Sequence, residues 1–238
     1  MNNVSCIIPI RSESKSIKHK NIKSLGNRPL VCHVIREALK SNIFDKIIIA
    51  TDSKKYIKEI KKFFHNNKHV EYYLRLKKNS RDNSPTELVL KEVIDNFFEK
   101  KKLNNHLSFL IQATSPFTSF KDLKNSLKYF KLYKFDSLFS STESKKFLWK
   151  KKNNIIFPIN YNFKKRVMRQ NFDREYYETG AFYIFKTKSF LKKRNRLFGK
   201  IGTYLTSEIN SLDINTKYDF ELAKLILSNR KKLTKFSE

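Results

Sequence analysis

The chain has little glycine, proline or cysteine, with 4, 5 and 2 residues of each in 238. The two cysteines, Cys6 and Cys32, are too few for a disulfide framework and lack the spacing of a zinc site. No apolar run approaches about 18 residues, so we expect no membrane-spanning helix. The first residues lead straight into a strand-like segment and lack the basic and apolar regions of a signal peptide. These absences predict a soluble, cytoplasmic protein.

Acidic residues are also scarce, because 22 Asp and Glu stand against 51 Lys and Arg, which gives a formal net charge of +29. Such a charge could serve a nucleic-acid partner, since the neutralisation of phosphates does not depend on sequence. The composition offers a second explanation: 40 Lys and 22 Asn beside 11 Arg and 5 Ala are typical of an AT-rich genome. The lysines are spread along the whole chain, so we favour genomic bias and a solvated basic surface over nucleic-acid binding.

Apolar material is plentiful, with 39% hydrophobic and 14% aromatic residues, which favours a buried core over disorder. The length fits one large domain. Apolar runs that predict strands alternate with helical patterns along the chain. The predicted strands are residues 4–10, 44–50, 71–76, 107–112, 136–140, 180–185 and 203–205, and the predicted helices are residues 30–39, 54–64, 85–98, 122–133 and 218–227.

This alternation predicts βαβ units and a mostly parallel sheet. Ligands of such sheets bind beyond the carboxyl ends of the strands, which here are residues 9–11, 50–53 and 112–116. Each of these ends continues into polar residues, where we expect a site. The stretch from about residue 142 to 177 has poor periodicity and indicates an extended arm or a small subdomain.

The loop after the first strand combines hydroxyl groups and cations, in Arg11, Ser14, Lys15 and Lys20. Arg and Lys neutralise the charge of a polyphosphate, while hydroxyls and backbone N–H groups bind its oxygens. Neither the Walker A pattern nor the glycine-rich dinucleotide pattern is present in this chain. The loop is therefore a candidate phosphate site, and an exposed basic loop is the alternative.

Asp213 and Asn215 are two residues apart in a strand-like stretch, so both side chains should point the same way. Two oxygens can then face one hard cation, and a turn or cap aspartate is the alternative. Ser84, followed by Pro85 and Glu87, has the pattern of a helix N-cap. The five histidines have no ligand spacing of a known type, so we assign none of them to catalysis.

A series of short motifs follows in a fixed order between residues 4 and 227. They are Ile8-Pro9-Ile10-Arg11 with Ser14-Lys15, Lys20-Asn21-Ile22 with Gly26 and Pro29-Leu30, Ala50-Thr51-Asp52-Ser53, Arg75 with Asp82 and Ser84-Pro85-Thr86, Leu110-Ile111-Gln112-Ala113-Thr114-Ser115-Pro116, Arg169-Gln170, Glu178-Thr179-Gly180-Ala181-Phe182-Tyr183-Ile184, and Asp213-Ile214-Asn215-Thr216 with Asp219. In this order they resemble the motifs of the acylneuraminate cytidylyltransferases, the CMP-sialic acid synthetase family.

The resemblance implies a fold and a reaction. The implied fold is a three-layer αβα, Rossmann-like nucleotidyltransferase core with a mostly parallel sheet, one domain over residues 1–238 with an inserted dimerisation arm at 141–177. In the implied reaction, the anomeric hydroxyl of an acidic nine-carbon sugar attacks the α-phosphate of CTP, with Mg²⁺ assistance, and gives a CMP-sugar and pyrophosphate. The resemblance also implies that the protein is a cytoplasmic homodimer, and we expect no nucleic-acid or membrane partner.

The resemblance also assigns residues to the site. Those expected to bind CTP are Arg11, Ser14, Lys15, Lys20, Asn21, Arg75, Asp82, Ser84 and Thr86. Those expected to bind the sugar are Gln112, Thr114, Ser115, Arg169, Gln170, Thr179, Gly180 and Tyr183. Asp213 and Asn215 are expected to hold Mg²⁺, and Asp213, Arg11 and Lys20 to be catalytic. Other interpretations stay open for some of them: a polar turn for 112–115, a solvated charge for Arg169 and a core aromatic for Tyr183.

Three departures from the family pattern leave rival functions open. Ser16 stands where the family commonly has glycine, Asn215 where it usually has aspartate, and Phe117-Thr118 where it often has Leu-Arg. A positive φ at Ser16 would cost about 1 kcal/mol or more. The rivals are a transferase for legionaminic, pseudaminic or a related 3-deoxy-ulosonic acid, a family member that binds CTP without turnover, and a basic nucleic-acid-binding α/β protein.

Overall fold

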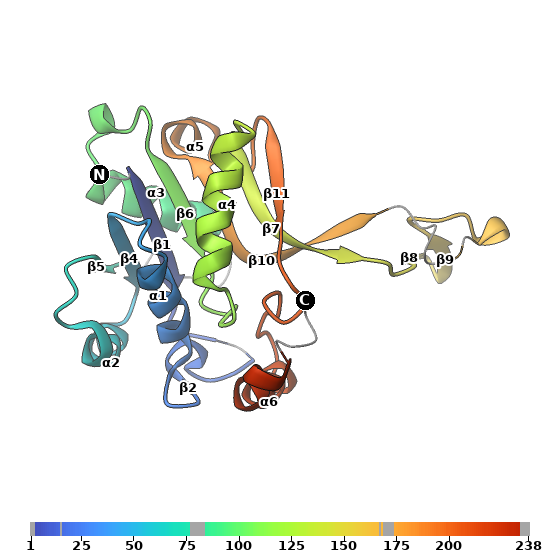
Figure 1. The fold of residues 1–238 in the computed structure, drawn as a ribbon, viewed down its shortest axis with the longest axis horizontal. Coiled ribbons are helices and arrows are strands. Elements are labelled where there is room, and N and C mark those ends of the chain that lie inside the picture. The colour runs from blue at the N-terminus through green and yellow to red at the C-terminus, as the bar shows by residue number, and fades with distance from the viewer. Residues whose placement is uncertain (1–2, 15, 77–83, 167, 169–173, 234–238) are drawn as a thin grey trace.

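The computed structural model of the protein describes residues 3–14, 16–76, 84–166, 168 and 174–233 (Figure 1). A seven-stranded sheet in the order β11-β7-β10-β6-β1-β4-β5 forms its centre. The strands are β1 (Val4–Ile10), β4 (Lys46–Thr51), β5 (Val70–Leu74), β6 (Leu107–Ile111), β7 (Ser137–Ser144), β10 (Glu175–Lys186) and β11 (Ile201–Leu205). Neighbours pair in parallel except that β10 is antiparallel to β6 and β7. The predicted mostly parallel sheet is confirmed.

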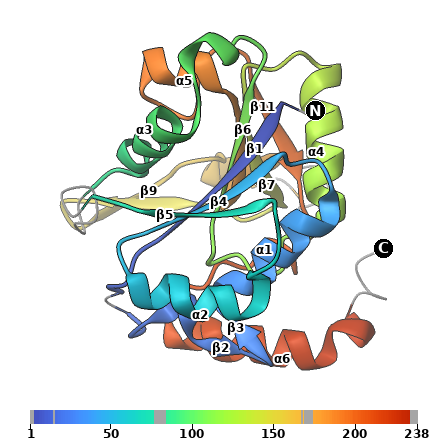
Figure 2. The same cartoon turned by 90° about the vertical axis from the view of Figure 1, so that its left-hand side faces the viewer.

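Helices cover both faces of the sheet (Figures 1 and 2). One layer contains α1 (Leu30–Ser41), α2 (Lys54–Phe64) and α4 (Phe120–Leu132), and the other contains α3 (Thr86–Phe97) and α5 (Thr187–Lys193). A hydrophobic core lies between the sheet and each helix layer. Successive side chains of β1 point into opposite cores, since Cys6 and Ile8 pack in the first and Ile7 in the second. The predicted three-layer αβα core is therefore confirmed.

A third, smaller core lies beside the sheet. It packs α6 (Lys217–Leu233) against the short hairpin of β2 (Ser24–Leu25) and β3 (Arg28–Pro29). Phe220 and Ala223 of the helix are buried in it. The short 3₁₀ turns of the chain are η1 (Lys20–Ile22), η3 (Lys100–Lys102) and η4 (Phe163–Lys165).

Capping groups explain where two helices begin. Helix α4 starts before the predicted residue 122 because the Ser119 side chain accepts the Asp122 N–H and the Asp122 carboxylate accepts the Ser119 N–H. In α3 the N-cap position is occupied by Pro85, and no side-chain cap is present. The predicted N-cap role of Ser84 is therefore wrong, because the helix begins one residue later than the pattern suggested.

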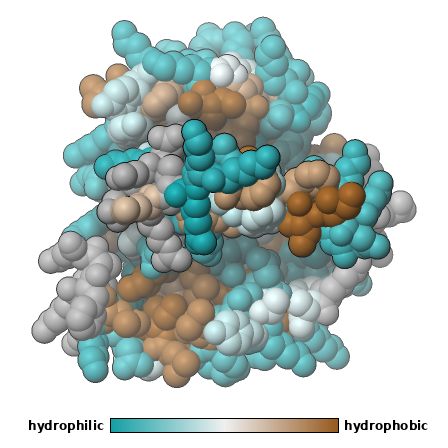
Figure 3. All heavy atoms as spheres, turned by 90° about the vertical axis from the view of Figure 1, so that its right-hand side faces the viewer, coloured by the Kyte–Doolittle hydropathy of each residue, from teal (hydrophilic) through white to brown (hydrophobic). Residues whose placement is uncertain are grey.

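The strands β7 and β10 continue beyond the sheet as a two-stranded ribbon that projects from the body of the molecule (Figure 1). The ribbon carries the hairpin of β8 (Trp149–Lys152) and β9 (Ile155–Pro158), most of whose residues are exposed. Figure 3 looks at the molecule from the side of this projection and shows exposed hydrophobic side chains beside hydrophilic ones. The predicted strand at 180–185 is longer than expected because it extends into this ribbon from Glu175.

Burial of a histidine makes the stability of the fold depend on pH. His106 is 6% exposed, and its Nδ1 lies 2.7 Å from Oγ1 of Thr187. Burial lowers the pKa of His106 to about 4. In the unfolded chain this pKa is about 6.5, so between these values the unfolded state binds the extra proton, and the free energy of unfolding falls as pH falls.

We expect this histidine alone to lower the free energy of unfolding by about 3 kcal/mol from about pH 7 to pH 4. Denaturant unfolding of the full chain across this range, compared with His106→Gln, measures the effect. The variant should lose stability with falling pH less steeply than the unmodified chain. Equal slopes for the two proteins contradict the prediction.

Candidate active site

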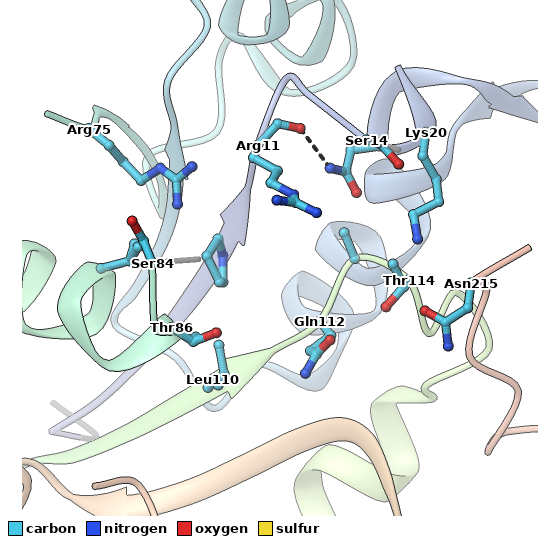
Figure 4. Close-up of a pocket in the computed structure, with 14 residues that line it drawn as sticks. Arg11, Ser14, Lys20, Arg75, Ser84, Thr86, Leu110, Gln112, Thr114 and Asn215 are labelled. Carbon is cyan, nitrogen blue, oxygen red and sulfur yellow. Dashed lines mark hydrogen bonds between the residues drawn. The ribbon is translucent and has the colours of Figure 1, made fainter. Parts of the chain in front are cut away.

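A cleft of about 340 Å³ opens at the carboxyl ends of β1 and β6 (Figure 4). It brings together residues that are far apart in the sequence. The predicted site residues that line it are Arg11, Ser14, Lys20, Asn21, Arg75, Ser84, Thr86, Gln112, Thr114 and Asn215. Pro9, Val89, Leu110 and Ala113 supply its apolar part. The cleft lies where ligands of a mostly parallel sheet are expected to bind.

The other predicted residues are placed differently. Lys15, Asp82, Arg169 and Gln170 lie outside the described residues. Ser115 is fully buried, and Thr179 Oγ1 lies 2.7 Å from Oγ of Ser140. Tyr183 is 2% exposed in the core formed with α3, and its hydroxyl donates to Glu178. Among the sugar-binding candidates that the structure describes, Gln112 and Thr114 are thus the ones that face the cleft.

Gly180 lies beside the cleft residue Gln112. Its φ is +74°, and a Cβ placed there would lie 3.6 Å from Nε2 of Gln112. Residues with a side chain rarely adopt such a φ, so glycine is favoured at this bend of β10. The register of β10 against β7 shifts between Glu178 and Tyr183, which is where the strand passes from the ribbon into the sheet.

The loop after β1 is held by Asp52, which follows β4. The Ser12 N–H donates to Oδ1 of Asp52 and the Ser12 hydroxyl donates to Oδ2, both at 2.8 Å. The Asn21 amide closes the loop by donating to the Arg11 carbonyl at 3.0 Å. In the described part of this loop His19 has a positive φ, at 54°.

Lys20 forms a buried cationic wall of the cleft. Its side chain is held by a 2.6 Å hydrogen bond from Nζ to the carbonyl of Ile214. Burial lowers the pKa of Lys20 and the Arg11 charge lowers it further, while the carboxylates of Asp213 and Asp219 act in the opposite direction. The ammonium group therefore lies close to a second cation, an arrangement suited to a ligand with several negative charges.

Arg75 forms the opposite cationic wall, just after β5 (Figure 4). It is 8% exposed, and its Nη2 lies 3.9 Å from Oδ1 of Asp52. Its Nε and Nη2 are buried and have no hydrogen-bond partner among the described residues. Buried donors are normally satisfied, so a ligand acceptor is expected here. The pKa of Arg75 is lowered by burial, against the influence of the Asp52 and Glu92 charges.

Asp52 and Glu92 are the site residues that the sequence reasoning missed. Glu92 of α3 is itself fixed, because Oε1 accepts the Tyr73 hydroxyl at 3.0 Å and the Leu76 N–H at 2.8 Å. The charges of both carboxylates act on Arg75, and Asp52 also lies 3.9 Å from its Nη2. For Asp52 a signal was available, because it directly follows a predicted strand. Glu92 carried none, since it lies within an ordinary helical pattern.

Asp213 and Asn215 lie together, although the strand predicted around them is wrong. The segment from 211 to 216 consists of turns and irregular backbone. It is attached to the sheet by the Ile214 N–H, which donates to the Thr114 carbonyl at 2.8 Å. The Asn215 amide donates to Oδ2 of Asp213 at 2.7 Å, and Oδ1 of Asp213 is buried without a partner among the described residues.

Asp213 and Asn215 could supply part of the ligand set of Mg²⁺, but not all of it. The pair offers a carboxylate oxygen without a partner and an amide oxygen at the edge of the cleft. Within the described residues no group of three or more His, Cys, Asp or Glu could hold a metal ion. Mg²⁺ commonly takes one or two carboxylates from the protein and its other ligands from phosphates and water.

The fold matches solved structures of a synthetase and a synthase. It superposes on CMP:2-keto-3-deoxy-manno-octonic acid synthetase complexed with CTP with a TM-score of 0.66 and 14% identity, over 95% of this chain and 99% of that one. It also superposes on 4-diphosphocytidyl-2C-methyl-D-erythritol synthase from Anaerococcus prevotii with a TM-score of 0.62 and 15% identity, over 94% and 96% of the two chains. These likenesses establish the α/β fold.

Comparison of the sequence assigns the chain to a family, which the fold alone does not do. The cytidylyltransferase family pattern matches residues 5–235, so the chain belongs to the cytidylyltransferase family. It is 29% identical to N-acylneuraminate cytidylyltransferase of Escherichia coli O18:K1:H7, over 97% of this chain and 54% of that protein. It is 26% identical to pseudaminic acid cytidylyltransferase of Campylobacter jejuni, over 93% of this chain and 94% of that protein.

The chain spans about half the length of the curated N-acylneuraminate cytidylyltransferases that it matches. For that of Streptococcus agalactiae serotype V, 27% identity extends over 90% of this chain and 51% of the relative. None of the helices in the described residues has the length and apolar character needed to cross a membrane.

Proposed function

We propose that the protein transfers CMP from CTP to a sialic-acid-like nonulosonic acid and releases pyrophosphate. The observation that carries the proposal is the convergence of Arg11, Lys20 and Arg75 on one cleft at the strand ends. A triphosphate and an acidic sugar are both anionic, so the joint substrate complex needs such a concentration of cations. Membership in the cytidylyltransferase family supports CTP as the nucleotide.

The cleft divides naturally between the two ends of CTP. Arg75, Ser84 and Thr86 line one side of it, while Lys20 and Asn215 lie across from them (Figure 4). We assign the cytosine and ribose to the first side, because Arg75 has buried donors to offer. The triphosphate then extends past Arg11 toward Lys20.

The cationic residues of the cleft act by stabilising the negative charge that develops during the reaction. The anomeric oxygen forms a bond to the α-phosphorus as the bond from the α-phosphorus to the bridging oxygen breaks. That oxygen leaves with the pyrophosphate, and the proton of the sugar hydroxyl passes to solvent water. Negative charge accumulates on the departing pyrophosphate, where Arg11 and Lys20 stabilise it. Gln112 and Thr114 line the same cleft and can hydrogen-bond the attacking sugar.

Asp213 and Asn215 would hold Mg²⁺ at the triphosphate end of the cleft. When bound, Mg²⁺ neutralises phosphate charge and helps to align the reacting groups. Asn215 keeps an oxygen ligand but lacks the charge of an aspartate. Asp213 therefore provides the protein's negative charge at this pair, and its Oδ1 has no hydrogen-bond partner among the described residues.

Pseudaminic acid is the second candidate sugar. Its Campylobacter jejuni cytidylyltransferase is matched over 94% of its length, unlike the N-acylneuraminate enzymes, which are about twice as long as the match. The decisive test is mass spectrometry of products from CTP, Mg²⁺ and a panel of N-acetylneuraminic, legionaminic, pseudaminic and 3-deoxy-octulosonic acids. A CMP adduct of one of these is expected, with UTP as the matched negative control. CTP binding by calorimetry with no adduct from any sugar would contradict turnover.

We further propose that the projecting arm pairs two copies of the chain in the cytoplasm. Its hairpin exposes Ile155 (59%) and Phe157 (48%) to solvent, and an isolated two-stranded hairpin is marginally stable in water. Packing against a second copy would cover these side chains, and exposed apolar patches commonly mark protein–protein interfaces.

Charges placed on this hairpin should separate the pair. Ile155→Lys/Phe157→Lys is expected to shift the mass in solution from a dimer toward the 28.5 kDa monomer, measured by light scattering after size-exclusion chromatography. Lys150→Gln/Lys152→Gln changes the directly paired positions of β8 and should leave the mass unchanged. A monomeric unmodified chain would contradict the proposal.

A further inference from the structure

Strand β4 lies between the two strands that lead to Arg11 and Arg75. In the sheet it pairs with β1 on one side and with β5 on the other. Arg11 directly follows β1, and Arg75 directly follows β5. Thr51 is the last residue of β4, and Asp52, which comes next, does not line the cleft itself. The end of β4 is therefore placed to contact the segments that carry both arginines.

On the β1 side, Asp52 binds Ser12 through both carboxylate oxygens. The Ser12 N–H donates to Oδ1 and the Ser12 hydroxyl donates to Oδ2, each at 2.8 Å. This N–H belongs to the peptide group between Arg11 and Ser12, whose carbonyl oxygen accepts the Asn21 amide at 3.0 Å. Both polar atoms of that planar group are thus hydrogen-bonded, which fixes the backbone from which the Arg11 side chain leaves.

The first turn of α2 completes the attachment of Ser12. The hydroxyl of the buried Tyr56 donates to the Ser12 carbonyl at 2.9 Å. The backbone N–H of Tyr56 in turn donates to the hydroxyl of the N-cap residue Ser53 at 3.3 Å. Ser12 is therefore held at its N–H, its hydroxyl and its carbonyl by one short segment, residues 52–56. The two bonds to Asp52 are the stronger ones, because their acceptor is charged.

On the β5 side, the end of β4 also holds Arg75. The Arg75 N–H donates to the Thr51 carbonyl at 2.7 Å, and Nη2 lies 3.9 Å from Oδ1 of Asp52. The two side chains are 6% and 15% exposed, so solvent screens their attraction little. Burial and the Arg11 charge lower the pKa of Arg75, whereas the charges of Asp52 and Glu92 raise it. Asp52 thus offsets the repulsion between two cations that line the same cleft.

We propose that Asp52 is a positioning residue that orients Arg11 and Arg75 together, from outside the cleft. The inference rests on the proposed function, in which Arg11 lies along the triphosphate and Arg75 at the nucleoside end of CTP. The carboxylate fixes Arg11 through its two bonds to Ser12, and it holds Arg75 through its charge. Side chains that are ordered before the ligand arrives lose less conformational entropy on binding.

The sign of the expected effect separates positioning from simple charge. Removal of a carboxylate makes the cleft more positive, so charge alone should strengthen the binding of an anion. Positioning predicts the reverse. Asp52→Ala removes both bonds to Ser12, and we expect it to weaken the binding of CTP and of inorganic tripolyphosphate by about tenfold or more. Calorimetry on the full chain without Mg²⁺, at about 0.15 M salt, measures both affinities.

Asp52→Asn separates the two contacts. Asparagine can accept the Ser12 N–H through Oδ1 and donate to the Ser12 hydroxyl through Nδ2, but it places no charge beside Arg75. The affinity for tripolyphosphate should therefore stay within about threefold, while the preference for CTP over tripolyphosphate should fall by about fivefold or more. Ser12→Ala should give the opposite pattern, with weaker binding of tripolyphosphate and an unchanged preference for CTP.

Asp122 provides the matched control. At the start of α4 its carboxylate accepts the N–H and the hydroxyl of Ser119, as that of Asp52 does from Ser12, and it does not line the cleft. Asp122→Ala removes the same charge and the same kind of bonds, and it should leave both affinities within about twofold.

Unchanged or tighter binding of both probes by a folded Asp52→Ala would overturn the role of Asp52. If Asp52→Ala does not fold, the patterns of Asp52→Asn and Ser12→Ala decide alone, and identical effects of these two variants on both probes would overturn it. An unmodified chain that binds neither CTP nor tripolyphosphate would overturn the proposed function and this role with it.

Discussion

Replacing Asp213 with asparagine should lower the rate of CMP-sugar formation at least about 100-fold without unfolding the protein. Asn215 contributes no charge, so Asp213 carries the negative charge of the pair that faces Mg²⁺. Oδ1 of Asp213 is buried without a partner among the described residues, which is unfavourable for the fold and favourable for a ligand. The asparagine side chain has nearly the same shape, so the protein should stay folded, although the buried Lys20 ammonium loses a favourable charge. Pyrophosphate release and circular dichroism measure the two quantities.

The reverse change at Asn215 provides the matched comparison. Asn215→Asp adds a carboxylate at the neighbouring position and should lower the Mg²⁺ concentration needed for half-maximal rate. A chain that binds CTP through Arg11 and Lys20 alone would respond to neither variant. Wild-type kcat/KM in Asp213→Asn would therefore exclude the metal role while leaving the cation cleft intact.

The layered core was predictable because its pattern is local. The continuous apolar run of β1, which is buried along nearly its whole length, and the apolar faces of α1 and α2 can be read directly from the order of residues. The direction of β10 could not be read in this way. An apolar strand at 180–185 looks the same whether it pairs in parallel or antiparallel, and its pairing with β6 and β7 depends on the whole ribbon.

The candidate site was predictable to the extent that its residues follow strand ends. Arg11 and Gln112 directly follow β1 and β6, so the topology alone brings them together. The proximity of the Asp213 and Asn215 side chains was expected for the wrong reason, since irregular backbone and not a strand brings them together. Glu92 could not be found from the sequence, because its contact with the site arises from packing of α3 against the end of β5.

The net charge of +29 takes on a definite meaning once the cations are placed. Arg11, Lys20 and Arg75 line the cleft together. Such a compact concentration of charge suits a small anion. A duplex nucleic acid would instead require a continuous basic face. The remaining lysines increase the long-range attraction of anionic substrates without defining a site.

Lys20→Met should produce a loss in kcat/KM for CTP of about 10²- to 10³-fold. The charges of Arg11 and of the Asp213 carboxylate both act on the Lys20 ammonium. We therefore expect Lys20 to stabilise the triphosphate on binding and the pyrophosphate as it departs. Methionine keeps the length of the side chain but removes the charge and the hydrogen bond to the Ile214 carbonyl. Lys18→Met removes an exposed charge from the same loop and should cost less than about twofold, as expected for a screened surface charge.

The pH profile separates a catalytic Lys20 from one that only anchors the segment at Ile214. Since burial lowers the Lys20 pKa, kcat/KM of the unmodified enzyme should fall on the alkaline side at a lower pH than for an ordinary lysine. Lys20→Arg keeps its charge throughout that range, so whatever activity it retains should show no such fall. If Lys20→Met loses activity but keeps the same alkaline limb as the unmodified enzyme, the fall belongs to another group. The role of Lys20 is then to hold the backbone that carries Asp213, and the pyrophosphate charge is stabilised by Arg11.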